Sequence, residues 1–314
     1  MRAPIPETVV PPAGAKGATG GGSPLRAVLL LFAAILCFDL MSVLVRILLA
    51  GYSAPELSAY RNVLGVIPSL LLLIWTGELR LRGSNLRITR WKLALFRGVM
   101  VALAQLFFYA AIGYLELATV SALGQTNALF VVLLSVLILG ERVGPWRVAA
   151  LLIGFAGAVW IVRPGSDAFS LAALLPVGAA LCYAVSMITL RMFGPGVSNG
   201  LLYLYSSAAA ALGAIVIAGF TTEFTPIASL RDAALIFAMA MAGGVGVLLL
   251  MLAYRMGAPS MLATFGYFGI LSAFALGWLF FGEAPLETLF PGVFLIVGAG
   301  VLIIWRENRG RGGR

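Results

Sequence analysis

Four acidic or basic side chains lie inside long apolar stretches of the chain, where a charged group is unfavourable unless it has a structural or functional role. Asp39 lies near the middle of the first stretch, while Arg46, Arg61 and Arg97 lie nearer to stretch ends. An ionised carboxylate at the centre of a bilayer costs about 2.5–3.5 kcal/mol, and the short Asp side chain cannot extend to the interface. Asp39 is therefore either a protonated structural residue bonded to a neighbour, or a substrate or proton site in a polar cavity.

The arginines suit recognition of an anionic group. Arg46 follows Asp39 by seven residues, on about the same helix face and ~10 Å further along the axis, a spacing that fits a small zwitterion. Arg46 and Arg61 lie on consecutive predicted helices, and a guanidinium binds carboxylate or phosphate with two parallel hydrogen bonds. Two alternatives remain open: Arg46 and Arg97 extend to the interface, and Arg61 pairs with Glu56.

Uncharged polar side chains reach a similar depth in four of the predicted helices. One or two such residues would only join helices, but seven of them indicate a lined cavity. With Asp39, Arg46 and Arg61 they form the predicted substrate-binding set, the seven being Gln105, Tyr109, Gln125, Asn127, Tyr183, Ser186 and Tyr267.

The elements that must position these residues are ten apolar stretches, each about as long as a helix that crosses a bilayer. We predict an all-α integral membrane protein with ten transmembrane helices. The predicted spans lie near residues 27–49, 55–76, 92–113, 118–139, 146–163, 169–191, 199–220, 232–254, 259–281 and 286–305.

Composition agrees, since 61% of the residues are hydrophobic and 11% are charged, against about 25% charged in soluble domains. The chain has no His and only two Cys, Cys37 and Cys182, both in apolar runs. We therefore expect no metal site, no cofactor and no disulfide. A hydrolase would need a His or paired carboxylates near a nucleophile, so we also expect no enzymatic activity.

The ten apolar stretches form two copies of a pattern of five stretches. AAILCFDLMSVLVR (33–46) matches GAALCYAVSMITLR (178–191), and the Gly-Glu pair at 140–141 recurs at 282–283. An odd number of spans in each copy inverts the second relative to the first, as in secondary transporters. We predict a disordered tail over 1–24, a first repeat over 25–165, a second repeat over 166–306 and a basic tail over 307–314.

Charge predicts the orientation. If the spans alternate, sixteen of the 21 basic residues lie on the side of both termini, two lie on the other side, and three are inside spans. The positive-inside rule then predicts that both termini lie in the cytoplasm. The predicted location is a bacterial-type inner membrane. The net charge of +9 accordingly predicts contact with anionic lipid and no nucleic-acid partner.

These residues resemble the EamA-type members of the drug/metabolite transporter superfamily over about residues 26–306. The resemblance rests on Leu139-Gly140-Glu141-Arg142 followed by GFAG at 154–157, and on the degenerate copy at 281–283 and 297–300. Arg46 and Arg61 stand where the family has basic residues, whereas Phe38-Asp39-Leu40-Met41 replaces a common Trp-Gly-Ser-Asn-like run. The resemblance implies a ten-helix carrier with helices 1–4 and 6–9 around a central path and helices 5 and 10 as outer support.

The function that we predict is secondary transport, by alternating access, of a small polar or amphipathic metabolite. Relatives in the family move amino acids, vitamins, nucleoside-like cofactors and cationic drugs, so the resemblance implies a small-molecule substrate of one such class. No GxxxxGK[ST] motif occurs, so ATP is not the direct energy source in this chain; proton coupling through Asp39 and facilitated exchange remain the options. The alternatives are a lipid-handling flippase subunit, an intramembrane enzyme or a channel.

Overall fold

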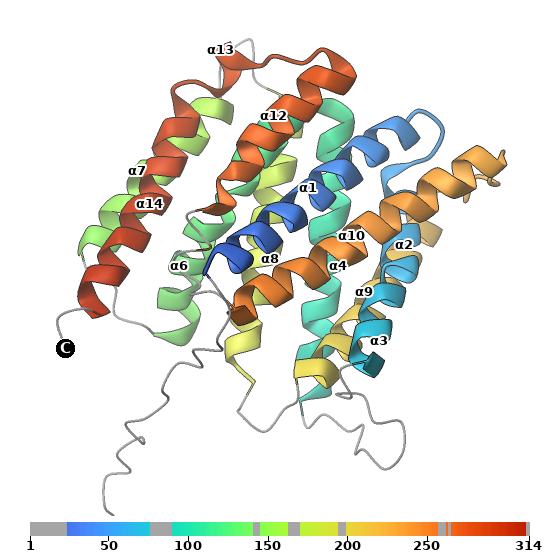
Figure 1. Ribbon diagram of the computed structural model, residues 1–314, viewed down its shortest axis with the longest axis horizontal. Coiled ribbons are helices and arrows are strands. Elements are labelled where there is room, and N and C mark those ends of the chain that lie inside the picture. Colours follow the sequence, from blue (N-terminus) through green and yellow to red (C-terminus); the bar gives the residue numbers. More distant parts are fainter. Residues whose placement is uncertain are drawn as a thin grey trace, which may run out of the picture.

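The computed structural model describes residues 24–75, 90–140, 145–162, 170–193, 199–256, 262 and 265–311, and every regular element in these ranges is helical. Six helical segments within them are long and apolar enough to cross a membrane, and shorter apolar helices accompany them. The elements, shown in Figure 1, are α1 (Pro24–Leu48), α2 (Ala54–Leu64), α3 (Val66–Trp75), α4 (Trp91–Tyr114), α5 (Leu117–Gly124), α6 (Asn127–Leu139), α7 (Pro145–Val162), the 3-10 helix η1 (Leu171–Ala173), α8 (Leu174–Arg191), α9 (Asn199–Thr221), α10 (Leu230–Met256), α12 (Phe268–Phe281), α13 (Leu286–Leu289) and α14 (Gly292–Arg311).

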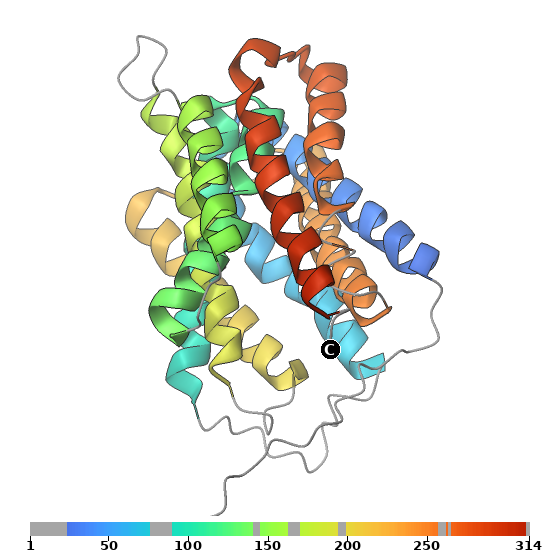
Figure 2. The ribbon, with the colours of Figure 1, turned by 90° about the vertical axis from the view of Figure 1, so that its left-hand side faces the viewer.

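The helices form a bundle in which segments far apart in the chain lie side by side. Helix α1 packs along α10, and α4 packs between α8 and α9. Helices α7 and α14 pair at one edge of the bundle, as Figures 1 and 2 both show. The backbones of this pair come so close that a Cβ added to Gly157 would lie 2.7 Å from the Gly292 carbonyl oxygen. This edge pair corresponds to the fifth and tenth predicted spans.

The second and fourth predicted spans are each divided into two helices. The second span breaks at Gly65 between α2 and α3, and the fourth breaks at Gln125 and Thr126 between α5 and α6. The break at Thr126 has a counterpart at Tyr267, which precedes α12 with nearly the same backbone angles (φ −61°, ψ −14° and φ −65°, ψ −14°). Helix breaks inside a membrane bundle expose backbone groups that a cavity or a neighbour must satisfy.

The glycine of the repeated Gly-Glu motif has the same backbone conformation in both copies. Gly140 ends α6 with φ +65°, and Gly282 ends α12 with φ +68°. Glycine has no Cβ and adopts this left-handed conformation without steric cost, which explains why both copies carry it at the helix end.

The tenth predicted span differs most from the structure. It was expected to begin at residue 286, but a short helix, α13, comes first and α14 begins only at Gly292. Pro291 separates them, since proline lacks an N–H and disfavours helical geometry in the preceding residue. Helix α14 also continues to Arg311, beyond the residue at which the basic tail was predicted to begin. Of the tail predicted over 1–24, only Pro24 is described, and it begins α1; residues 1–23, the pair 141–142 and residues 312–314 lie outside the described residues.

Candidate substrate cavity

Two adjoining cavities lie in the centre of the bundle. We call the end that carries residues 49–53, 115–116, 222–229 and 282–285 the distal end, and the end where α4 begins and α10 and α14 finish the proximal end. The distal cavity, of about 240 Å³, extends to Leu117 and Val120 near the distal end. The proximal cavity, of about 420 Å³, extends to Arg97 and Leu250 near the proximal end. Both walls include the same four side chains, Phe38, Phe108, Asn127 and Tyr183.

The distal cavity holds Asp39 beside the two helix breaks. The Ser272 hydroxyl of α12 donates a short hydrogen bond to Asp39 Oδ2. The Gln125 side-chain amide donates to the Gly266 carbonyl oxygen at 3.4 Å, so the break after α5 contacts the break before α12. Asp39 thus combines two features foreseen as alternatives, because it is bonded to a neighbouring hydroxyl and also lines a cavity.

Arginines line the proximal cavity instead. Arg61 comes from α2 and Arg97 from α4, and no acidic residue occurs among the described residues of this wall. The Arg61 guanidinium interacts with the hydroxyl of Tyr109, and Arg97 Nη1 donates to the Ser186 carbonyl oxygen at 3.3 Å. The positive charge of both residues persists, because arginine is not deprotonated in proteins.

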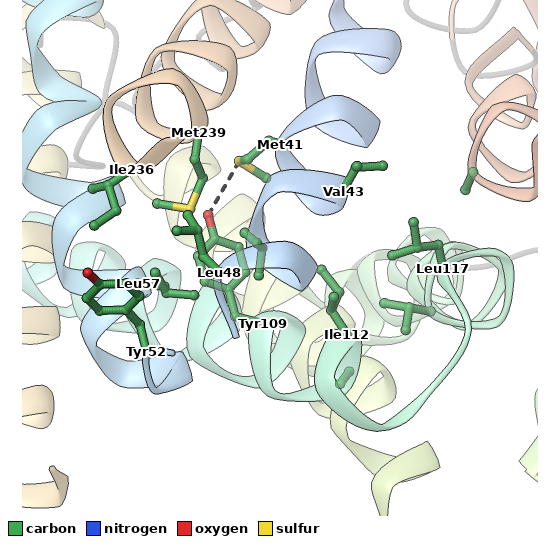
Figure 3. Close-up of a cluster of buried hydrophobic side chains, with 14 residues drawn as sticks. Met41, Val43, Leu48, Tyr52, Leu57, Tyr109, Ile112, Leu117, Ile236 and Met239 are labelled. Carbon is green, nitrogen blue, oxygen red and sulfur yellow. Dashed lines mark hydrogen bonds between the residues drawn. The ribbon is translucent and has the colours of Figure 1, made fainter. Parts of the chain in front are cut away.

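The remaining wall of the proximal cavity combines apolar side chains with polar ones, several of which are deeply buried. Tyr109 has no exposed surface, and its hydroxyl donates to Met41 Sδ at 3.4 Å, as drawn in Figure 3. The Tyr183 hydroxyl interacts with the amide of Gln105, a residue that is 5% exposed. Away from solvent such hydrogen bonds are stronger, and a buried polar group that lacks a partner is destabilising.

Arg46 lies outside the lining of both cavities. Its Nη2 is 2.6 Å from Glu283 Oε1, its Nη1 donates to the Leu115 carbonyl oxygen at 2.9 Å, and its guanidinium lies 5.0 Å from the Phe281 ring centre. Glu283 Oε2 also accepts the Leu117 N–H at 3.0 Å. This cluster, Arg46 with Glu283 and the 115–117 turn, joins α1, α4, α5 and the residues after α12.

Burial raises the pKa of Glu283 above its usual range, and the Leu117 N–H and the Arg46 charge act in the opposite direction. A buried carboxylate loses its hydration, and a nearby guanidinium favours its charged form. The Arg46 charge and the Leu117 N–H therefore favour the ionised form of Glu283 against its burial.

The alternative in which Arg61 pairs with Glu56 is not what the structure shows for these two side chains. Glu56 is 1% exposed and accepts the Ser53 N–H at 2.6 Å and the Ser53 hydroxyl at 2.7 Å. It also accepts a short hydrogen bond from the Thr225 N–H. The Glu56 carboxylate thus belongs to a capping box with Ser53 at the start of α2. Its hydrogen bond with Thr225 joins α2 to the 222–229 loop.

The structure brings eight of the ten predicted binding residues to the cavity walls: Asp39, Arg61, Gln105, Tyr109, Gln125, Asn127, Tyr183 and Ser186. Arg46 and Tyr267 lie elsewhere, and Tyr267 packs against the cluster around Leu123 and Ile270. Sequence reasoning did not include Arg97, which it allowed to extend to the interface, or Ser272, a serine without a distinguishing pattern. Glu283 had a usable signal, because it belongs to the repeated Gly-Glu pair.

Apolar helices long enough to cross a membrane, packed around cavities that contain charged and polar side chains, are typical of a multi-pass membrane protein that carries small molecules. The EamA-like transporter family model matches residues 25–163. The pseudopaline exporter of Pseudomonas aeruginosa (strain UCBPP-PA14) is 30% identical over 273 residues, covering 87% of this chain and 93% of the exporter. The riboflavin transporter of Rhizobium johnstonii is 34% identical over 224 residues, covering 68% and 70%.

The fold also resembles a crystal structure with a TM-score of 0.62 and 20% identity, which spans 91% of this chain and 99% of that one. The chain belongs to the EamA-like transporter family of the drug/metabolite transporter superfamily. It is a secondary transporter of metabolites, and its relatives are transporters and not enzymes.

Proposed function

We propose that the protein has ten membrane spans in two inverted five-helix repeats and moves a small polar or amphipathic metabolite through the two central cavities by alternating access. The observation that carries this proposal is the contact between Gln125 and Gly266, which joins the corresponding helix breaks of the two repeats at the cavity wall. Inverted-repeat transporters form their midplane sites from such discontinuous helices. The equal φ angles of Gly140 and Gly282 support the same pairing of the repeats.

In the proposed orientation the protein lies in the inner membrane with both of its termini in the cytoplasm. Its support is the excess of basic residues on the side of the termini. In this orientation the distal end faces outward. Arg46 with Glu283, and Glu56 with Thr225, then close the outer side, and the proximal cavity lies on the cytoplasmic side.

The proposed substrate-binding residues are the eight that line the cavities. Substrates named for the relatives, pseudopaline and riboflavin, are organic metabolites with several polar groups, and a panel for this chain begins with amino carboxylates and flavins. Lipid contact on the exposed helix faces follows from the same topology.

Filling the distal cavity tests the transport path. A Cβ on Gly124 would meet no atom within 4 Å, and this residue lines the distal cavity. Gly124→Leu should therefore fold normally and reduce uptake into proteoliposomes at least about tenfold, by occupying the space that a substrate needs. Gly219→Leu is the matched control, because Gly219 is also helical, with nothing within 4 Å, but lies exposed on α9. Equal transport by the two variants would contradict the proposed path.

Proton coupling through Asp39 is a separate proposal with its own test. If Asp39 gains and loses a proton during transport, Asp39→Asn should remove the pH dependence of uptake between about pH 5.5 and 8 while leaving binding measurable. Ser272→Ala serves as the comparison, since it removes only the hydroxyl that donates to Asp39. A pH profile that is unchanged in the Asn variant would assign Asp39 a structural role.

A further inference from the structure

The proximal cavity contains an unusual set of side chains for the middle of a membrane bundle. Arg97 lies six residues into α4, about 9 Å along its axis, and Arg61 lies seven residues into α2, about 10 Å from the opposite end. Both line one cavity, and no acidic residue accompanies them among the described residues of its wall. Positive charge at this depth is costly unless a negative group lies close to it.

The wall also carries polar atoms that the protein itself leaves without a partner. Four buried side-chain atoms in this cavity make no hydrogen bond with the described part of the chain: Arg61 Nε, Gln105 Oε1, Asn127 Oδ1 and Ser206 Oγ. Gln105 and Ser206 are only 5% and 7% exposed. Buried polar groups in proteins are almost always paired, so a cluster of exceptions on one cavity wall marks a place for a ligand.

The chemistry of these atoms describes the ligand. Guanidinium groups are donors that match a carboxylate or phosphate, whereas the amide oxygens of Gln105 and Asn127 accept from N–H or O–H groups. We propose that Arg61 and Arg97 form an oxyanion site in the proximal cavity, so that the substrate carries a carboxylate or phosphate group together with hydrogen-bond donors. This inference rests on the proposed function, since it assigns a substrate class to the same cavity.

The charges of the two cavities then differ in sign. The oxyanion would lie at Arg61 and Arg97 in the proximal cavity, and the distal cavity presents the carboxyl group of Asp39. Asn127 and Tyr183 line both cavities and would contact the middle of the substrate. The sequence suggested Arg46 and Arg61 together as the anion-binding arginines, but Glu283 pairs with the Arg46 guanidinium.

Charged thiol reagents test the site without knowledge of the substrate. In full-length protein with Cys37→Ala and Cys182→Ala, Ser207→Cys places one thiol on the wall of the proximal cavity. A negatively charged methanethiosulfonate should react at least about tenfold faster than a positively charged one, after each rate is divided by that for a free thiol. Arg61→Gln and Arg97→Gln should each lower this preference at least about threefold. Arg231→Gln, which removes a charge from an exposed position at the start of α10, should leave it unchanged.

The outcomes separate this inference from the proposed function. Reaction with both reagents but without preference, or a preference that neither Gln variant lowers, would overturn the oxyanion site and leave the cavity as a transport path. Failure of both reagents to reach the thiol would contradict the accessible cavity itself, and the proposed function would fall with it.

Protection of the same thiol identifies the oxyanion. Glycerate and glycerol phosphate are each compared with glycerol, their counterpart without an oxyanion, at millimolar concentration. Slower labelling with glycerate or with glycerol phosphate alone assigns carboxylate or phosphate, and no slowing by either anion would overturn the site. Arg61→Lys and Arg97→Lys keep the charge, so they should retain the reagent preference but lose most of the protection, because an ammonium lacks the planar fork.

Discussion

The distal end and the proximal cavity contain similar side chains but use them differently. At the distal end Arg46 pairs with Glu283, Glu56 accepts three hydrogen bonds, and the Tyr52 hydroxyl connects Asp232 with the Ala228 N–H. In the proximal cavity polar atoms of Arg61, Gln105 and Ser206 have no partner in the described chain.

This difference separates structural polar groups from functional ones. Several distal contacts, such as Arg46 with Glu283 and Glu56 with the Thr225 N–H, join segments that are distant in the chain. In the cavity, Arg61, Gln105 and Ser206 each keep a hydrogen-bonding atom without a partner in the described part of the chain. Removing a distal group should therefore reduce stability, whereas removing a cavity group should reduce substrate affinity.

The largest expected effect is at Glu283. Glu283→Ala leaves the Arg46 guanidinium and the Leu117 N–H without their partner, and we expect a loss of about 2–4 kcal/mol in the free energy of unfolding. The pair itself contributes little net stability, since burial opposes the charge, but breaking it leaves an uncompensated cation. The measurement is equilibrium unfolding in mixed detergent micelles. Glu223→Ala, at an exposed position in the distal loop, should change stability by less than about 0.5 kcal/mol; similar losses in the two variants would refute the role of the cluster.

The second prediction compares the two arginines directly. Arg61→Lys should raise the apparent KM by the equivalent of about 1–3 kcal/mol, because a charge-assisted fork is replaced by a point charge. Arg46→Lys should leave KM nearly unchanged and lower stability instead, since its partners are Glu283 and the Leu115 carbonyl. Transport kinetics and unfolding are measured on both variants with expression controlled. The comparison breaks down if Arg46→Lys alone alters KM.

The smallest expected change in stability concerns two hydroxyl groups, the capping hydroxyl of Ser53 and the buried hydroxyl of Ser206. Ser53→Ala removes the cap of α2 and one of the donors to Glu56, at a cost of about 1 kcal/mol in stability. Ser206→Ala removes a buried hydroxyl without a partner, so stability should stay the same or rise slightly. Both free energies come from the same unfolding assay. Equal destabilisation by the two substitutions would show that the cavity hydroxyl is structural.

Many features of this protein could be predicted from short stretches of sequence. The apolar lengths placed most helices to within a few residues, because a helix that crosses a bilayer must satisfy its backbone internally and is therefore recognisable locally. The repeated Gly-Glu pair was visible in the sequence, and its glycines, Gly140 and Gly282, have the same left-handed conformation at helix ends. Asp39 could be singled out because a carboxylate in an apolar stretch is costly wherever the helix packs.

Only the tertiary structure decided which charged groups meet. Arg46 and Arg61 look alike in the sequence, yet one pairs with Glu283 and the other lines a cavity beside Tyr109. Arg97 belongs to that cavity because α4 packs against α8 and α9, and no local pattern carries this information. Charge partners and cavity walls depend on which helices pack together and at what depth. Apolar periodicity says little about this packing, because nearly every position of these helices is apolar.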